Sequence, residues 1–237
     1  MFRSASIVAI AISVMISATP LQAAKTEVNK ENLLATLNAD DTVRGKEESK
    51  AWTLLFDAYL QLSKPPFTVG KQFNLETIWP GMDGWDKVSA WAAANPGMGK
   101  AILAASDKVI IGLPYGLDQV PASYAGMKLY VDVKIEGSKR SLDFGYFDAI
   151  DAIQAYATAE AYRLFESGDV DGALKLIAAN NFVLRMFCDR EFLKEKTFFI
   201  SLLDKTLSNM RDYFWRYQDK ISVEQYRVIA MDELPYL

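Results

Sequence analysis

Apolar side chains recur every three or four positions through the carboxy-terminal part of the chain, from Phe147 onward. This spacing places them on one face of a helix, so the pattern predicts three or four amphipathic helices in succession. The apolar faces of the first three carry Ile150, Ile153, Ala157, Ala161 and Leu164; Leu174, Ile177, Leu184 and Cys188; and Phe199, Leu203, Met210, Tyr213 and Tyr217. The first helix is expected to stop at Ser167-Gly168, and a last helical segment is expected from Val223 to Leu234, before Pro235. Short connections between helices are typical of antiparallel neighbours.

The amino-terminal part shows helical spacing in two segments, Lys30 to Leu37 and Glu47 to Leu62. In the second segment, one broad apolar face is formed by Trp52, Leu55, Phe56, Tyr59, Leu60 and Leu62. The sequence Ser63-Lys64-Pro65-Pro66 is expected to end this helix, because the residue before a proline is disfavoured in the helical conformation.

Proline and glycine gather between residues 64 and 126, a stretch that holds six of the eight prolines and eight of the thirteen glycines. This composition predicts a loop-rich region with only short helices. One is expected from Asp83 to Ala94, with Asp83 as its N-cap and Asn95-Pro96-Gly97 as its end. Another is expected from Met98 to Lys108.

A single segment alternates apolar and polar residues with a period of two, which is the spacing of a half-buried β-strand. Leu129, Val131, Val133 and Ile135 alternate there with Tyr130, Asp132, Lys134 and Glu136. Gly137-Ser138 is expected to turn the chain into a second short strand that runs through Phe144. An isolated hairpin is only marginally stable, so this one needs a helix packed against it.

The predicted fold class is mainly α: an array of antiparallel helical hairpins with a short β-strand or hairpin and a loop-rich cover. Residues 24–237 are interpreted as one helical domain, with a loop-rich middle at 64–126 and a carboxy-terminal helical array at 147–237. Function is expected on the cover, because irregular segments held by a rigid scaffold can bring binding groups together.

Residues 1–23 have the organisation of a signal peptide. Arg3 supplies a positive charge, Ile7 to Ile16 form a short apolar run, and Leu21-Gln22-Ala23 resembles a signal peptidase site. A retained anchor is the alternative, but the apolar run is well short of the roughly 20 residues that span a bilayer. We therefore expect a secreted or periplasmic protein with no membrane span after cleavage.

Charge and composition exclude several classes of function. With 26 basic and 30 acidic residues the chain carries a net charge of −4, which argues against nucleic acid as a partner. It contains no histidine, which excludes Ser-His-Asp and Cys-His relays and imidazole zinc sites. The single cysteine, Cys188, cannot form an internal disulfide, and its neighbours Met186 and Phe187 favour a buried thiol. No cofactor is expected.

Tryptophans and acids cluster in the loop-rich middle and form the candidate ligand surface. Aromatic faces stack on sugar rings while acids and amides bind hydroxyls, a combination typical of glycan recognition. The alternative is that the tryptophans fill the core. The candidate residues are Trp79, Asp83, Trp85, Asp86, Tyr115 and Asp118.

Carboxylate pairs are the remaining acid–base machinery in a chain without histidine. A glycoside-cleaving pair needs two carboxyl groups roughly 5–10 Å apart. The loop-rich region offers Glu76, Asp83, Asp86 and Asp118, although Asp83 and Asp86 also match a helix cap and its first turn. Asp169 and Asp171 alternate as in a calcium loop, but the twelfth-position glutamate is missing, so calcium is not expected.

Two resemblances concern architecture only. The turn from Gly168 to Ala173, with Ala161 and Leu164 before it and Ile177 after it, resembles one tetratricopeptide hairpin, but no second copy follows at the expected spacing, which favours an ordinary helical hairpin. Four further blocks resemble uncharacterised secreted helical proteins of planctomycete-type bacteria, a likeness that assigns no chemistry. These blocks are Thr77–Met82, Gly112–Gly116, Ala155–Glu160 and Glu233–Leu237.

The leading functional hypothesis is a non-enzymatic binding or assembly module with a protein or glycan partner in the cell envelope. The alternative is a carboxylate-dependent hydrolase of envelope or extracellular polysaccharide. A third hypothesis, a peripheral subunit held by a membrane partner, predicts an exposed apolar patch of several hundred Å².

Overall fold

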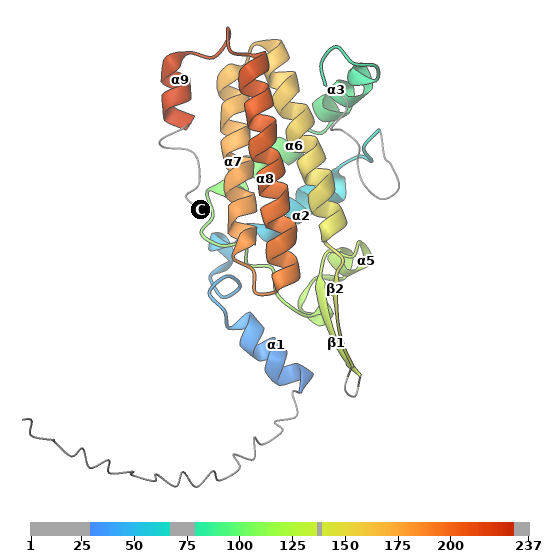
Figure 1. Ribbon diagram of the computed structural model, residues 1–237. Helices are drawn as coiled ribbons and strands as arrows, with labels where there is room; N and C mark the ends of the chain where they lie inside the picture. Colours follow the sequence, from blue (N-terminus) through green and yellow to red (C-terminus); the bar gives the residue numbers. More distant parts are fainter. Residues whose placement is uncertain (1–28, 67–78, 137–138, 230–237) are drawn as a thin grey trace, which may run out of the picture.

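The computed structural model describes residues 29–66, 79–136 and 139–229 (Figure 1). The predicted signal peptide, residues 1–23, and Glu76 lie outside these ranges. The chain is mainly α-helical, as predicted from its periodicity. Its α-helices are α1 (Lys30–Asn38), α2 (Trp52–Gln61), α3 (Trp85–Ala94), α4 (Pro96–Ser106), α5 (Ala122–Gly126), α6 (Phe147–Ser167), α7 (Val170–Cys188), α8 (Leu193–Arg216) and α9 (Val223–Val228).

The long helices α6, α7 and α8 lie side by side as a bundle (Figure 1), and α7 packs against both of the others. The apolar face predicted for α8 is confirmed, because Phe199, Leu203, Met210, Tyr213 and Tyr217 are all buried. The first turn of the bundle falls where the sequence predicted it. Gly168 follows α6 with φ 86°, a left-handed conformation that glycine adopts without strain. The Asp169 carboxylate then caps α7 by accepting a hydrogen bond from the Gly172 N–H at 3.0 Å.

The shorter helices cover one side of this bundle. Helix α4 packs on α7 and α2, while α3 packs on α6. The main apolar core lies among these elements and includes Leu55, Phe56 and Ile102, all fully buried. A second, smaller apolar cluster fills the far end of the bundle, where Ile221 and Ile229 join α6, α7 and α8.

The predicted β-hairpin is present. Strand β1 (Val131–Glu136) pairs antiparallel with β2 (Lys139–Phe144), and Val131 lies opposite Phe144. Strict alternation fails at Asp132, which is only 5% exposed although its position predicted a polar face. Its carboxylate forms an ion pair with Lys30 of α1 at 3.5 Å, so the contact between α1 and β1 covers it.

Three predicted helix boundaries are wrong, and each differs from the prediction for its own physical reason. The helix predicted from Glu47 begins only at Trp52, because the Ala51 N–H bonds to the Ile110 carbonyl at 3.0 Å and residues 47–49 form a 3₁₀ turn. The helix predicted from Asp83 begins at Trp85, and its N-cap is Gly84 with φ 89°, so Asp83 does not cap it.

The third boundary concerns Pro96, which starts α4 instead of only separating two helices. Proline suits the first helical position because the N–H it lacks has no partner there. At the end of the chain, the predicted Val223–Leu234 helix is described from Val223 to Val228 as α9, and the remainder of that prediction falls outside the described residues.

A buried polar cluster joins the turn between α7 and α8 to the loop that contains Tyr115. Arg190 and Glu195 are both fully buried, and Nε of Arg190 lies 3.0 Å from Oε1 of Glu195. The hydroxyls of Tyr146 and Tyr115 donate to the same carboxylate at 2.6 and 2.9 Å. The Arg190 guanidinium also donates to the Leu113 carbonyl. We call these residues the Arg190–Glu195 cluster.

Candidate ligand groove between α6 and α8

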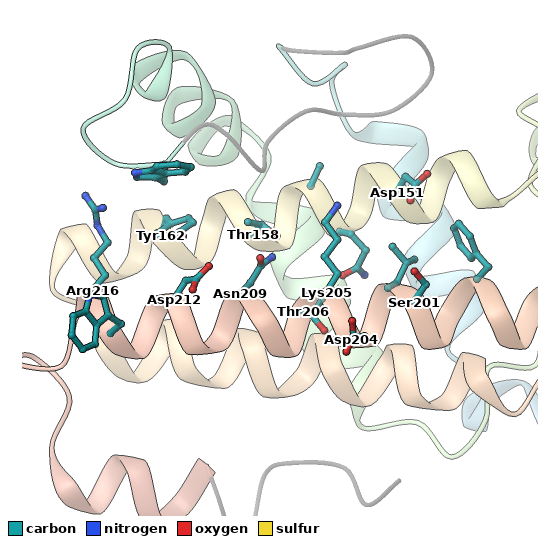
Figure 2. Close-up of a pocket in the computed structure, with 16 residues that line it drawn as sticks. Asp151, Thr158, Tyr162, Ser201, Asp204, Lys205, Thr206, Asn209, Asp212 and Arg216 are labelled. Atoms are coloured by element: carbon teal, nitrogen blue, oxygen red, sulfur yellow. The ribbon is translucent and has the colours of Figure 1, made fainter.

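A groove of about 880 Å³ runs between α6 and α8 (Figure 2). A volume of this size is in the range that small-molecule and cofactor sites occupy. Helix α6 lines it with Asp151, Gln154, Ala155, Thr158 and Tyr162, and α8 with Phe198, Ser201, Leu202, Asp204, Lys205, Thr206, Asn209, Asp212, Trp215 and Arg216. Trp79, from the segment before α3, completes the lining.

Helical periodicity explains why these side chains share one groove. On α8, residues 198, 201, 205, 209, 212 and 216 follow one another in steps of three and four, directly beside the stripe that packs into the core. Residues 151 and 162 on α6 are about 16 Å apart along the helix axis, and residues 198 and 216 on α8 about 27 Å, at about 1.5 Å per residue. The groove therefore suits an extended ligand.

Several groove side chains have hydrogen-bonding groups without a partner. Within the part of the chain that the structure describes, the side chains of Asp151, Thr158, Ser201 and Asn209 make no hydrogen bond. Figure 2 shows Asn209 directed from α8 toward α6. Side-chain amides, hydroxyls and carboxylates offer both donors and acceptors, so these groups are available to a polar ligand.

At the base of the groove, in contrast, the polar side chains form hydrogen bonds within the protein. Gln154 of α6 and Asn180 of α7 exchange two side-chain hydrogen bonds, at 3.0 and 2.8 Å. The buried Thr206 hydroxyl donates to the Leu203 carbonyl within α8. These pairs fix the helices that carry the free groups, which keeps the groove preformed in the absence of a ligand.

Asp151 is the ionisable group in the groove whose pKa departs most clearly from its ordinary value. Burial raises the pKa of Asp151 to about 6, and nearby Asp148 adds to the increase while Lys205 opposes it. The apolar side chains of Phe198 and Leu202 line the same groove, consistent with a partly dehydrated carboxyl. Near pH 6 this group is protonated in about half of the molecules, so it can donate as well as accept a proton.

Several aromatic side chains lie at one end of the groove. Trp79 and Tyr162 both line it, and Trp85 packs edge-to-face on Tyr162 with ring centroids 6.1 Å apart. Tyr162 in turn packs edge-to-face on the buried Tyr213 at 4.5 Å. These aromatic contacts link the first residue of α3 to the bundle.

Of the six residues predicted as a ligand surface, only Trp79 lines the groove. Trp85 does not line the groove itself but packs against Tyr162, which does. Asp83 and Asp86 are exposed in the turn before α3 and in its first helical turn, and neither lines the groove.

Tyr115 and Asp118 do not belong to this surface. Tyr115 has no exposed surface because its ring and hydroxyl are enclosed in the Arg190–Glu195 cluster, so this part of the prediction is corrected. Asp118 is exposed on the short 3₁₀ helix η2 (Leu117–Gln119), which contacts β1 near the amino-terminal end of α6. Tyr162 and Trp85 lie toward the other end of α6, so the predicted acids do not converge.

The sequence interpretation missed the residues of α6 and α8 that form most of the groove. Polar residues such as Asp151 and Asn209 recur at helical spacing, but a solvated helix face shows the same pattern. The way in which α6 and α8 pack around α7 is what makes this face a groove wall and not an ordinary solvent-exposed helix face.

The predicted burial of Cys188 is confirmed in part, because the thiol is half-buried and burial raises its pKa.

Among the described residues, no helix is both long enough and apolar enough to cross a membrane. In the same part of the chain, no group of three or more cysteine, aspartate or glutamate residues is arranged to hold a metal ion. No protein-family model, curated protein or solved structure matches the chain.

Proposed function

We propose that this protein is an extracytoplasmic binding module whose groove between α6 and α8 takes an extended polyhydroxylated ligand, such as an oligosaccharide segment of the cell envelope. The observation that carries the proposal is the set of groove side chains, typified by Asn209 and Thr158, that form no hydrogen bond with any described residue. Polar groups exposed in a groove and left without protein partners are suited to bonding ligand hydroxyls.

The aromatic end of the groove supports the same ligand class. Trp79 presents an indole and Tyr162 a phenol ring to the groove, beside the amide of Asn209 and the hydroxyl of Thr158. Sugars combine apolar C–H faces with hydroxyl groups, so they need both kinds of contact.

The charges of the groove favour an uncharged ligand over a polyion. Asp151, Asp204 and Asp212 line it together with Lys205 and Arg216, so neither sign dominates. A polyanion such as nucleic acid needs a continuous basic surface, and a polycation needs a continuous acidic one.

Calorimetric titration with a panel of neutral tetrasaccharides tests this proposal. We expect binding by the unmodified protein and about fivefold weaker binding by Asn209→Ala, because each polar contact to a ligand contributes on the order of 1 kcal/mol. Asn32→Ala is the matched control, since this asparagine lies exposed on α1 and does not line the groove. Absence of binding across the panel would refute the proposal.

Export is a separate part of the proposal and rests on the sequence of residues 1–23. Expression of the full chain in a bacterial host should release a protein that begins at Ala24. Intact mass of the purified product checks this, and a product that retains residues 1–23 in the cytoplasm contradicts it.

A second candidate function, a glycan hydrolase, is favoured by one observation, the pKa of about 6 at Asp151. A carboxyl that holds a proton near neutral pH can serve as a general acid, and a glycan hydrolase would also need a second carboxylate roughly 5–10 Å from it. Turnover of the same tetrasaccharides, abolished in Asp151→Asn while binding persists, would support it. Binding without turnover leaves the binding module as the function.

A further inference from the structure

Arg216 of α8 contacts a segment that lies outside the helical bundle. This residue is the last of α8, and its guanidinium donates a hydrogen bond to the carbonyl of Pro80, in the segment before α3. Figure 2 shows its side chain extending away from α8 at one end of the groove. Pro80 is buried and directly follows Trp79, which lines the groove.

The segment that receives this contact is a tight turn with its own hydrogen bonds. The Met82 N–H bonds to the Trp79 carbonyl at 3.0 Å, and the Trp85 N–H to the Met82 carbonyl at 3.1 Å. Gly81 and Gly84 have φ values of 91° and 89°, which non-glycine residues rarely adopt. The two hydrogen bonds stabilise the turn, so an anchor at Pro80 can influence its position relative to α8.

Two contacts tie this turn to the walls of the groove. Trp85, at its end, packs on Tyr162 of α6, and Pro80, near its start, is held by Arg216 of α8. The turn thus bridges both walls of the groove. Because Trp79 is adjacent to Pro80, the Arg216 contact governs the placement of its indole.

We propose that Arg216 is a positioning residue for the groove: it fixes the turn that carries Trp79, so that the indole forms the surface on which one ring of the ligand stacks. The stacking part rests on the proposed function. The positioning part concerns the protein alone and is tested without a ligand.

Hydrogen exchange of the ligand-free protein tests the positioning. We expect Arg216→Ala to raise the exchange rate of the amides of residues 82–85 about tenfold, with exchange in α6 and α7 unchanged, and Arg216→Lys to restore part of the protection. Arg44→Ala, which removes an exposed guanidinium in the loop after α1, is the matched control. Unchanged exchange at residues 82–85 in Arg216→Ala would overturn the proposal.

A double-mutant cycle on tetrasaccharide binding tests the stacking. If Arg216 acts through Trp79, then Trp79→Ala weakens binding about tenfold, Arg216→Ala weakens it by a similar or smaller factor, and the double variant binds no more weakly than Trp79→Ala alone. Losses that multiply in the double variant would show that Arg216 acts independently of Trp79, which overturns the proposal.

The two arms separate failure of this inference from failure of the proposed function. If the unmodified protein binds none of the tetrasaccharides, the proposed function is refuted, and the exchange measurement alone decides whether Arg216 positions the turn. Thermal unfolding of each variant shows whether it is folded, and the lysine variant provides the test if the alanine variant is not.

Discussion

Glu195 and Asp151 are two carboxyl groups of the helical bundle that are shielded from water, but only Glu195 has hydrogen-bond partners among the described residues. Glu195 is fully buried and accepts hydrogen bonds from Arg190, Tyr115 and Tyr146. Asp151 is partly buried and makes no hydrogen bond within the described residues. Burial of a carboxyl does not by itself mark a binding site. What distinguishes the two is whether the protein supplies the partners that water has lost.

The comparison also separates two uses of polar groups. The Arg190–Glu195 cluster joins segments far apart in the sequence, since Tyr115 and Glu195 are 80 residues apart. Its hydrogen bonds stabilise the fold. Among the described residues, the groove side chains of Asp151, Thr158, Ser201 and Asn209 make no hydrogen bond and are held in place only by their helices. A ligand can bond to the second group without breaking any contact of the fold.

The largest expected effect on stability comes from breaking the buried ion pair. Glu195→Gln leaves the Arg190 charge buried without a counter-charge, so we expect the free energy of unfolding to fall by about 3–5 kcal/mol. Urea denaturation followed by circular dichroism measures this change. A loss below about 1 kcal/mol would mean that water reaches the cluster and that the contrast with Asp151 is wrong.

A smaller loss is expected from one hydrogen bond of the same cluster. Tyr146→Phe removes the hydroxyl that donates to Glu195 at 2.6 Å and should lower the free energy of unfolding by about 1.5–3 kcal/mol, the range for bonds to charged groups. Tyr59→Phe is the control, since Tyr59 is only half-buried and its hydroxyl makes no hydrogen bond among the described residues. Equal losses in the two variants would argue against a special role for the cluster.

At Asp151 we expect a substitution to raise the free energy of unfolding and not to lower it. Its folded-state pKa of about 6 lies above its ordinary value of 3.8, so the folded protein binds the proton more tightly than the unfolded chain. Stability contributed by this group is therefore highest below pH 4 and is lost as the pH rises through 6. Asp151→Asn should stabilise the protein by about 1 kcal/mol at pH 7.5, after allowance for solvent screening of the partly exposed group.

The same substitution should change little at pH 4, where the native carboxyl is already protonated. Denaturation of both proteins at the two pH values measures the difference, and exposed Asp118→Asn serves as control. A destabilised Asp151→Asn at pH 7.5 would indicate that the ionised carboxylate is satisfied within the protein.

The smallest effect on folding is expected at the free groove residues. Ser201→Ala removes a hydroxyl without a described partner and should change the free energy of unfolding by less than about 0.5 kcal/mol. The same urea titration checks this. A loss above 1 kcal/mol would show that the side chain supports the fold, which would weaken its assignment to ligand binding.

The groove could not have been predicted from the sequence. The acids and tryptophans chosen from the loop-rich middle attract attention because they cluster there, yet Asp118 and Trp79 lie toward opposite ends of α6. Asp151 and Asn209 have ordinary positions on helices, and 58 residues separate them. They line one groove only because α6 and α8 both pack on α7.

The sequence by itself determined the elements whose signals are local. The apolar period of α8, the turn at Gly168 and the presence of strand β1 each depend on residues within a few positions of one another, so they appear in the structure as predicted. Tertiary structure decided the start of α2, the burial of Asp132 and the composition of the groove. Each of these depends on a contact between distant segments, whose formation is governed by how the helices pack and not by the preference of any short stretch of chain.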